Sequence, residues 1–114
     1  MIKPALLLLS LVAVLPAVAQ TYPTKPVRLI VPFPPGGSTD IVGRVVAQKL
    51  TESWGQQVIV DNRGGAGGQI GVELAAKSAP DGYTLVVGHI GTFGVNPTLY
   101  PRLRYDATKD FVPI

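Results

Sequence analysis

Hydrophobic residues occur along the chain in short runs that are separated by stretches of helical spacing. The first run, Val27 to Val31, is rich in β-branched residues, and three prolines and two glycines follow it within residues 32–37. An apolar run bounded by turn residues predicts a buried strand. Similar runs at residues 57–61 and 83–87 predict two further strands.

The stretch after the first strand has the spacing of an amphipathic helix. We expect this helix to be capped by Ser38 or Thr39, to carry Asp40 in its first turn, and to end near Trp54 with Gly55 as the stop signal. Its buried face is predicted from the large apolar residues Ile41, Val42, Val45, Val46 and Leu50.

A shorter helix is predicted over residues 69–78, with Ile70, Leu74 and Ala75 facing inward. The order is then strand, helix, strand, helix, strand, and the strands are continuously apolar. This pattern predicts an α/β fold, a partial doubly wound parallel sheet joined by right-handed crossovers. Residues 98–109 are predicted to be irregular, and residues 111–114 to begin another strand.

Glycine is concentrated in the segments that follow the three strands. These segments, residues 33–40, 62–68 and 88–96, are all predicted to be loops. Because the carboxyl ends of parallel strands share one edge of a sheet, the three loops should lie together there, and ligands of open α/β sheets bind at that edge.

The first 19 residues have the pattern of a segment that is removed from the mature protein. Lys3 precedes an apolar run over residues 5–15, and Ala17-Val18-Ala19 has the A-x-A pattern of a cleavage site. This arrangement predicts a secretory signal peptide over residues 1–19, with Gln20 as the first mature residue. The apolar run is too short to cross a bilayer, which takes about 18 residues or more.

Composition and charge exclude several classes of function. The chain has no cysteine and one histidine, so it offers neither a disulfide scaffold nor a thiolate metal site, and no other metal site is predicted. Its formal net charge of +3 falls by one when the signal peptide is removed, which gives no case for nucleic-acid binding.

The first two loops each lead into the start of a helix, where backbone N–H groups lack intrahelical partners. They offer small uncharged residues, Gly36 to Thr39 and Gly65 to Gly68, with only Arg63 as a nearby positive charge. Such a site suits a carboxylate held by directed hydrogen bonds. Asp40 would either act as a cap or a partner of the helix dipole, or meet an amine on the ligand.

A nucleotide-dependent α/β enzyme is the alternative. Residues 65–71 have the pattern G-x-G-x-x-x-G, one residue longer than the dinucleotide fingerprint, but they follow the second strand and lack a suitably placed acidic partner. His89 has no nucleophile to activate, so catalysis is not predicted and no cofactor is expected.

Motifs over nearly the whole mature chain resemble the Bug-type solute-binding receptors of tripartite tricarboxylate transporters. They include VPFPPGG (31–37), VDNR (60–63), GAGG (65–68), PDGYTL (80–85), Asn96-Pro97 and Tyr105-Asp106. Gly64 departs from the family pattern, which usually has proline there. Family members are much longer, so residues 20–114 are expected to be the N-terminal part of the first ligand-binding domain, a fragment without the second domain.

The resemblance implies a periplasmic receptor, not an enzyme, that closes two α/β domains on a small organic carboxylate and delivers it to membrane permease subunits. It implies that the first loop and the second glycine loop hold one end of the ligand, and that the third loop lines the cleft. The ligand-binding residues expected on this basis are Phe33, Gly36, Gly37, Ser38, Thr39, Asp40, Ala66, Gly67, Gly68, His89, Gly91 and Thr92.

Overall fold

The computed structural model of the chain describes residues 19–114, so the predicted signal peptide lies almost wholly outside the described residues. Its elements follow in the order β1 (Val27–Val31), α1 (Ser38–Trp54), β2 (Val58–Asn62), the 3-10 turn η2 (Ala66–Gly68), α2 (Gln69–Ala76), β3 (Thr84–Val86), the π-helical turn η3 (Gly91–Val95) and α3 (Asn96–Leu99).

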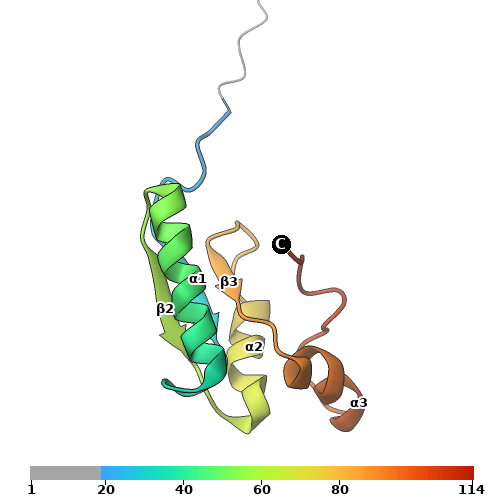
Figure 1. The fold of residues 1–114 in the computed structure, drawn as a ribbon. Helices are drawn as coiled ribbons and strands as arrows, with labels where there is room; N and C mark the ends of the chain where they lie inside the picture. Colours follow the sequence, from blue (N-terminus) through green and yellow to red (C-terminus); the bar gives the residue numbers. More distant parts are fainter. Residues whose placement is uncertain (1–18) are drawn as a thin grey trace, which may run out of the picture.

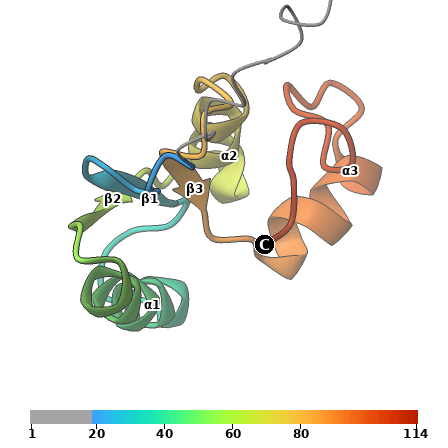
Figure 2. The same ribbon diagram turned by 90° about the horizontal axis from the view of Figure 1, so that it is seen from above.

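The strands form the predicted parallel sheet in the order β2-β1-β3, with Leu29 of β1 opposite Val60 and Leu85 (Figure 1). Helix α1 covers one face and α2 the other, as in a doubly wound fold (Figure 2). The central strand β1 is almost completely buried. The predicted α/β class and the parallel sheet are therefore confirmed.

Helix α1 has the predicted length but not the predicted buried face. Ile41, Val42, Val45 and Val46 are exposed, and the helix meets the sheet through the stripe Asp40, Gly43, Ala47, Leu50 and Trp54. Only Leu50 was assigned correctly. A Cβ on Gly43 would lie 2.9 Å from Val31 Cγ2, so the helix backbone approaches the strand more closely than a larger residue would permit.

In helix α2, too, a glycine is buried and a large apolar residue predicted to be buried is exposed. It buries Gly71 and Val72, whereas Ile70, predicted to face inward, is exposed. A Cβ on Gly71 would lie 2.6 Å from the carbonyl oxygen of Arg63 and 2.7 Å from Pro32 Cα. This glycine therefore brings α2 against the segments that follow β1 and β2.

The region after β3 differs most from its prediction. Residues 90–99 are helical rather than a loop, because η3 continues directly into α3. Residues 111–114 form no strand. Helix α3 lies on the β3 side of the sheet, away from β2 (Figures 1 and 2). Within residues 19–114, no helix has the length and apolar character needed to cross a membrane.

Candidate functional site

A cavity of about 370 Å³ opens at the carboxyl edge of the sheet, where the chain leaves β1 and β3. The first loop, the start of α1 and one residue after β3 line it: Phe33, Pro34, Pro35, Gly37, Ser38, Thr39 and His89. The structure thus brings together five of the twelve predicted site residues at one cavity, together with two prolines that sequence reasoning did not select.

The start of α1 supplies backbone donors to this cavity. Gly37 is the N-cap residue, with φ −79° and ψ 170°, and no side chain caps the helix. The predicted cap by Ser38 or Thr39 is therefore wrong, because both already belong to the first turn. Their N–H groups have no partner within the helix, and the helix dipole adds partial positive charge at this end. The geometry suits an anionic group.

Asp40 holds the first loop in place. Its Oδ2 accepts hydrogen bonds from the Gly36 N–H at 2.9 Å and from Arg44 Nε at 3.0 Å, and its Oδ1 accepts one from Asn62 Nδ2 at 2.8 Å. These donors, the Gly36 amide first, lower the pKa of Asp40 to about 2. Its oxygens face protein donors, so Asp40 holds the first loop against the start of α1. It lies in the first turn of α1, where the helix dipole favours a carboxylate.

These hydrogen bonds around Asp40, which we call the Asp40 clamp, extend to β2 through Asn62. Asn62 Nδ2 also donates to the carbonyl oxygen of Phe33 at 3.1 Å, and Arg44 Nη2 donates to Asn62 Oδ1 at 3.0 Å. Sequence reasoning missed Asn62 as a member of the site. The Asp40–Arg44 pair, by contrast, has the i,i+4 spacing at which helix side chains interact, so this contact could have been found.

His89 forms the opposite wall of the cavity. Its ring packs edge-on against Phe33, with 5.1 Å between ring centroids and an interplanar angle of 67°. Its Nδ1 accepts a hydrogen bond from the Gly91 N–H at 3.0 Å, which leaves Nε2 as the ring nitrogen able to donate. Gly91 and Thr92, both expected to line the cleft, do not line this cavity, and Thr92 is fully buried.

The second glycine loop forms the 3-10 turn η2 and does not line the cavity either. Gly68 has φ +87°, and a Cβ there would lie 2.5 Å from Thr92 Cγ2 and 3.2 Å from Phe33 Cζ. The loop is therefore packed directly behind the cavity wall. Ala66 and Gly67 are exposed, with φ of 50° and 65°.

Arg63 is ion-paired, and it shares its carboxylate partner, Asp61, with the guanidinium group of Arg28. Its Nε donates to Asp61 Oδ1 at 2.9 Å, and the other oxygen of that carboxylate pairs with Arg28. Burial opposes ionisation of Asp61, but the bonds from Arg28 and Arg63 prevail, and the net effect lowers the pKa of Asp61. In the described part of the chain, no three His, Asp or Glu side chains gather as a metal ion would require.

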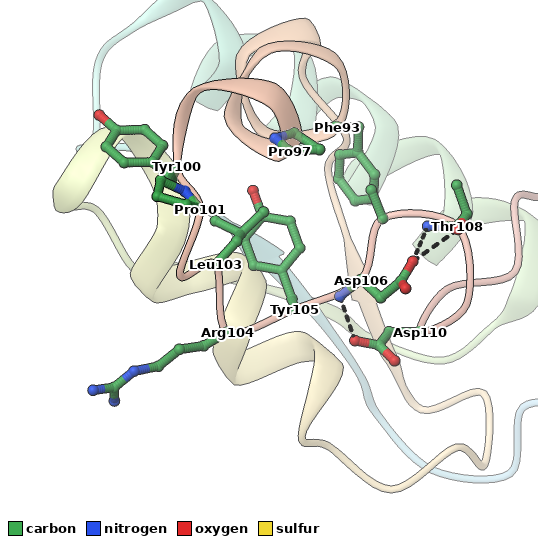
Figure 3. A pocket seen from close by; sticks show the side chains of 11 residues that line it. Phe93, Pro97, Tyr100, Pro101, Leu103, Arg104, Tyr105, Asp106, Thr108 and Asp110 are labelled. Atoms are coloured by element: carbon green, nitrogen blue, oxygen red, sulfur yellow. Dashed lines mark hydrogen bonds between the residues drawn. The ribbon is translucent and has the colours of Figure 1, made fainter.

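A second cavity of about 700 Å³ lies between α3 and the segment that follows it. Figure 3 shows the side chains around it, among them Phe93, Tyr100, Tyr105 and Asp106, with Arg104 pointing away. Sequence reasoning treated residues 98–109 as irregular and proposed no cavity there. This cavity is larger than the first, but it lies away from the helix start that offers free amides.

Comparison with known proteins identifies the family. The family described as "Tripartite tricarboxylate transporter family receptor" matches residues 42–114. The chain belongs to this family. It is a family of solute-binding receptors, so the chain is related to binding proteins and not to enzymes. The resemblance found in the sequence motifs is therefore confirmed.

Individual relatives agree in sequence and in structure. Protein BugT of Bordetella pertussis is 50% identical over 100 residues, which cover 87% of this chain and 31% of BugT. The periplasmic binding protein BugD matches with a TM-score of 0.77 and 43% identity, over 82% of this chain and 31% of BugD.

MatC from Rhodopseudomonas palustris, solved with bound malate, also matches with a TM-score of 0.77. It is 42% identical, over 81% of this chain and 31% of MatC. The chain thus spans about 31% of the length of each of these three relatives.

Proposed function

We propose that the chain forms one side of a periplasmic receptor cleft that captures a small organic carboxylate. The start of α1, where Gly37, Ser38 and Thr39 open into the cavity at the carboxyl edge of the sheet, is the observation that carries this proposal. Family membership supports it, and MatC holds malate, a dicarboxylate.

The proposed contacts use dipoles rather than formal charges. One carboxylate oxygen would accept from the backbone N–H groups of the first turn, and the hydroxyls of Ser38 and Thr39 could donate to the other. His89 Nε2 would donate from the opposite wall. Charge-assisted hydrogen bonds of this kind are about twice as strong as neutral ones, and the helix start favours an anion.

The domain organisation belongs to the same proposal. Residues 1–19 would direct secretion, and residues 20–114 would form the N-terminal part of the first ligand-binding domain. The permease subunits of a tripartite tricarboxylate transporter would receive the ligand. Family membership supports the statements on the domain and on the permease, and the sequence pattern of residues 1–19 supports the statement on secretion.

The glycines that suggested nucleotide binding are explained by packing or by backbone conformation. Gly65 has φ +123°, and a Cβ there would lie 2.7 Å from Ile70 Cδ1. Gly68 and Gly71 likewise have no room for a side chain. Gly67, the middle glycine of the G-x-G-x-x-x-G pattern, has open space around it, but its φ of +65° favours glycine. Packing and backbone conformation together account for the pattern without a phosphate group.

Isothermal titration calorimetry on the complete gene product tests the proposal. The panel contains malate, adipate and citrate, the diamide of malate as a matched neutral control, and ATP and NAD. We expect at least one carboxylate to bind, and its neutral amide to bind far more weakly. Binding of a nucleotide with no response to any carboxylate would refute the proposed function.

A further inference from the structure

Behind the 370 Å³ cavity lies a cluster of buried polar side chains, none of which lines that cavity. Thr92, Asn96 and Tyr105 are 0%, 5% and 6% exposed. A buried polar group is costly unless it is hydrogen-bonded. Within the described residues, no buried side-chain nitrogen or oxygen lacks a partner. The cluster is therefore fully satisfied, and its bonds join separate segments of the chain.

Two of these bonds come from Asn96 at the start of α3. Its Nδ2 donates to the carbonyl oxygen of Gly67 at 3.2 Å and to the Tyr105 hydroxyl at 3.3 Å. The Tyr105 hydroxyl in turn donates to the carbonyl oxygen of Thr92 at 2.5 Å. The second glycine loop, the helix after β3 and the C-terminal segment are thus tied together at one point.

Thr92 carries this connection to the cavity wall. Its Oγ1 donates to the carbonyl oxygen of His89 at 2.9 Å and lies 3.3 Å from the His89 backbone nitrogen. Its methyl group occupies the space beside Gly68, where a Cβ would come within 2.5 Å. A displacement of Thr92 therefore moves both His89, which lines the cavity, and the turn that packs behind Phe33.

We propose that Tyr105 and Asn96 are positioning residues of the ligand site, because their hydrogen bonds to Thr92 and Gly67 fix the wall that His89 and Phe33 form. This inference rests on the proposed function for its effect on affinity. Neither residue lines the 370 Å³ cavity. Both act through the backbone of the segments that do, or of those packed directly behind it.

Packing alone does not account for the hydroxyl of Tyr105. Its ring already contacts Phe93 (Figure 3) and Phe111, each with centroids 6.4 Å away, and a phenylalanine would keep both contacts. The hydroxyl fixes how the joined segments are oriented, because a hydrogen bond requires a defined geometry whereas an apolar contact does not. Directed bonds are what a site made of backbone donors needs to keep its shape.

The decisive variant is Tyr105→Phe in the complete gene product, with Tyr100→Phe as the matched control. Tyr100 lies in the same segment but is 40% exposed and outside the hydrogen-bonded cluster. Asn96→Asp is the second variant, since it keeps the size of the side chain but places an oxygen against the carbonyl oxygen of Gly67. For each protein, calorimetry gives Kd for the carboxylate panel, and NMR gives the backbone amide resonances without ligand.

Tyr105→Phe removes two buried hydrogen bonds, to the Thr92 carbonyl oxygen and from Asn96 Nδ2. We expect part of this loss to reach the cavity and to raise Kd about three- to tenfold. We also expect shifts of the Gly67, Gly68 and His89 amide resonances. Asn96→Asp should act in the same direction, and the double variant should be non-additive because the two side chains share a bond. Tyr100→Phe should leave Kd and these resonances unchanged.

A role in stability alone predicts a different result. Tyr105→Phe would then lower the melting temperature, while at 25 °C its Kd would stay within twofold of the original and the three amide resonances would not move. That result would overturn the inference. If the unaltered protein binds no member of the panel, the proposed function fails, and the amide shifts alone then decide whether the two residues position this wall.

Discussion

Replacement of Gly37 by valine separates ligand binding from folding at the start of α1. Gly37 lines the cavity, and its φ of −79° is available to any residue. A Cβ there would meet nothing closer than the Pro34 carbonyl oxygen at 3.9 Å. The valine methyl groups would therefore extend into the cavity beside the free amides without a clash inside the protein.

The expected magnitudes differ for the two properties. Valine is a poorer N-cap than glycine by about 1 kcal/mol, and the stiffer unfolded chain offsets this by about 0.4–1 kcal/mol. The free energy of unfolding should therefore change by about 1 kcal/mol or less. Loss of two charge-assisted hydrogen bonds to a carboxylate costs about 3 kcal/mol, which corresponds to a roughly hundredfold rise in Kd.

Gly55→Val provides the opposite control. Gly55 ends α1 at the other edge of the sheet with φ +68°, and open space surrounds it. Valine in this left-handed conformation should cost about 1–2 kcal/mol of stability and leave Kd unchanged. Calorimetry and urea unfolding of both variants of the complete gene product make the comparison. If Gly37→Val folds normally and binds a carboxylate with the original Kd, the anion-binding role of the helix start is wrong.

Two further predictions concern the frame around the cavity. Gly68→Ala should lower the free energy of unfolding by about 2–4 kcal/mol, because Gly68 has a left-handed conformation and a Cβ there would overlap with Thr92. Gly67→Ala, with φ +65° and open space, should cost only about 1 kcal/mol. Equal costs in urea unfolding would contradict the packing of Gly68. Because the pKa of Asp40 is lowered to about 2, its ionised form stabilises the fold above the ordinary carboxyl pKa, and this contribution is lost as the pH falls from about 4 through 2. The difference in melting temperature between the original protein and Asp40→Asn should therefore shrink over that range. A constant difference would contradict the stabilising role of the Asp40 hydrogen bonds.

The sheet could be predicted because its signals are local. The run Val27 to Val31 is apolar except for Arg28, and turn residues bound it. The burial of its apolar residues therefore follows from its own sequence. The buried face of α1 could not be predicted from the same kind of signal. Two apolar stripes run along this helix, and the bulkier one is exposed, because the helix packs closely through Gly43 and Ala47. Close packing of backbones depends on the partner strand, which a single segment does not encode.

The position of the candidate site at one edge of the sheet could be predicted from topology, but its full set of residues could not. Parallel strands place the segments that follow them at one edge, so the cavity between Phe33 and His89 follows from topology. The helix over residues 90–99 was missed because Gly91 and Gly94 lower helix propensity, and tertiary contacts overrode that preference. The cluster around Tyr105 joins residues as far apart as Gly67 and Tyr105, and no spacing rule connects such positions.

In the proposed binding mode, the residues that contact the ligand are uncharged, and the charged residues lie behind them. The residues that line the cavity carry no carboxylate, ammonium or guanidinium group, whereas the charged side chains nearby are paired behind it: Asp40 with Arg44, and Asp61 with Arg28 and Arg63. The hydrogen bonds of these charged groups fix the backbone that carries the donors. Selectivity for a carboxylate at such a site therefore depends on how well the amides of the first turn are held in place. The Asp40 clamp holds them from one side, and the Tyr105 cluster holds the opposite wall. Substitutions at residues that do not line the cavity should for this reason change affinity as well, although less strongly than Gly37→Val.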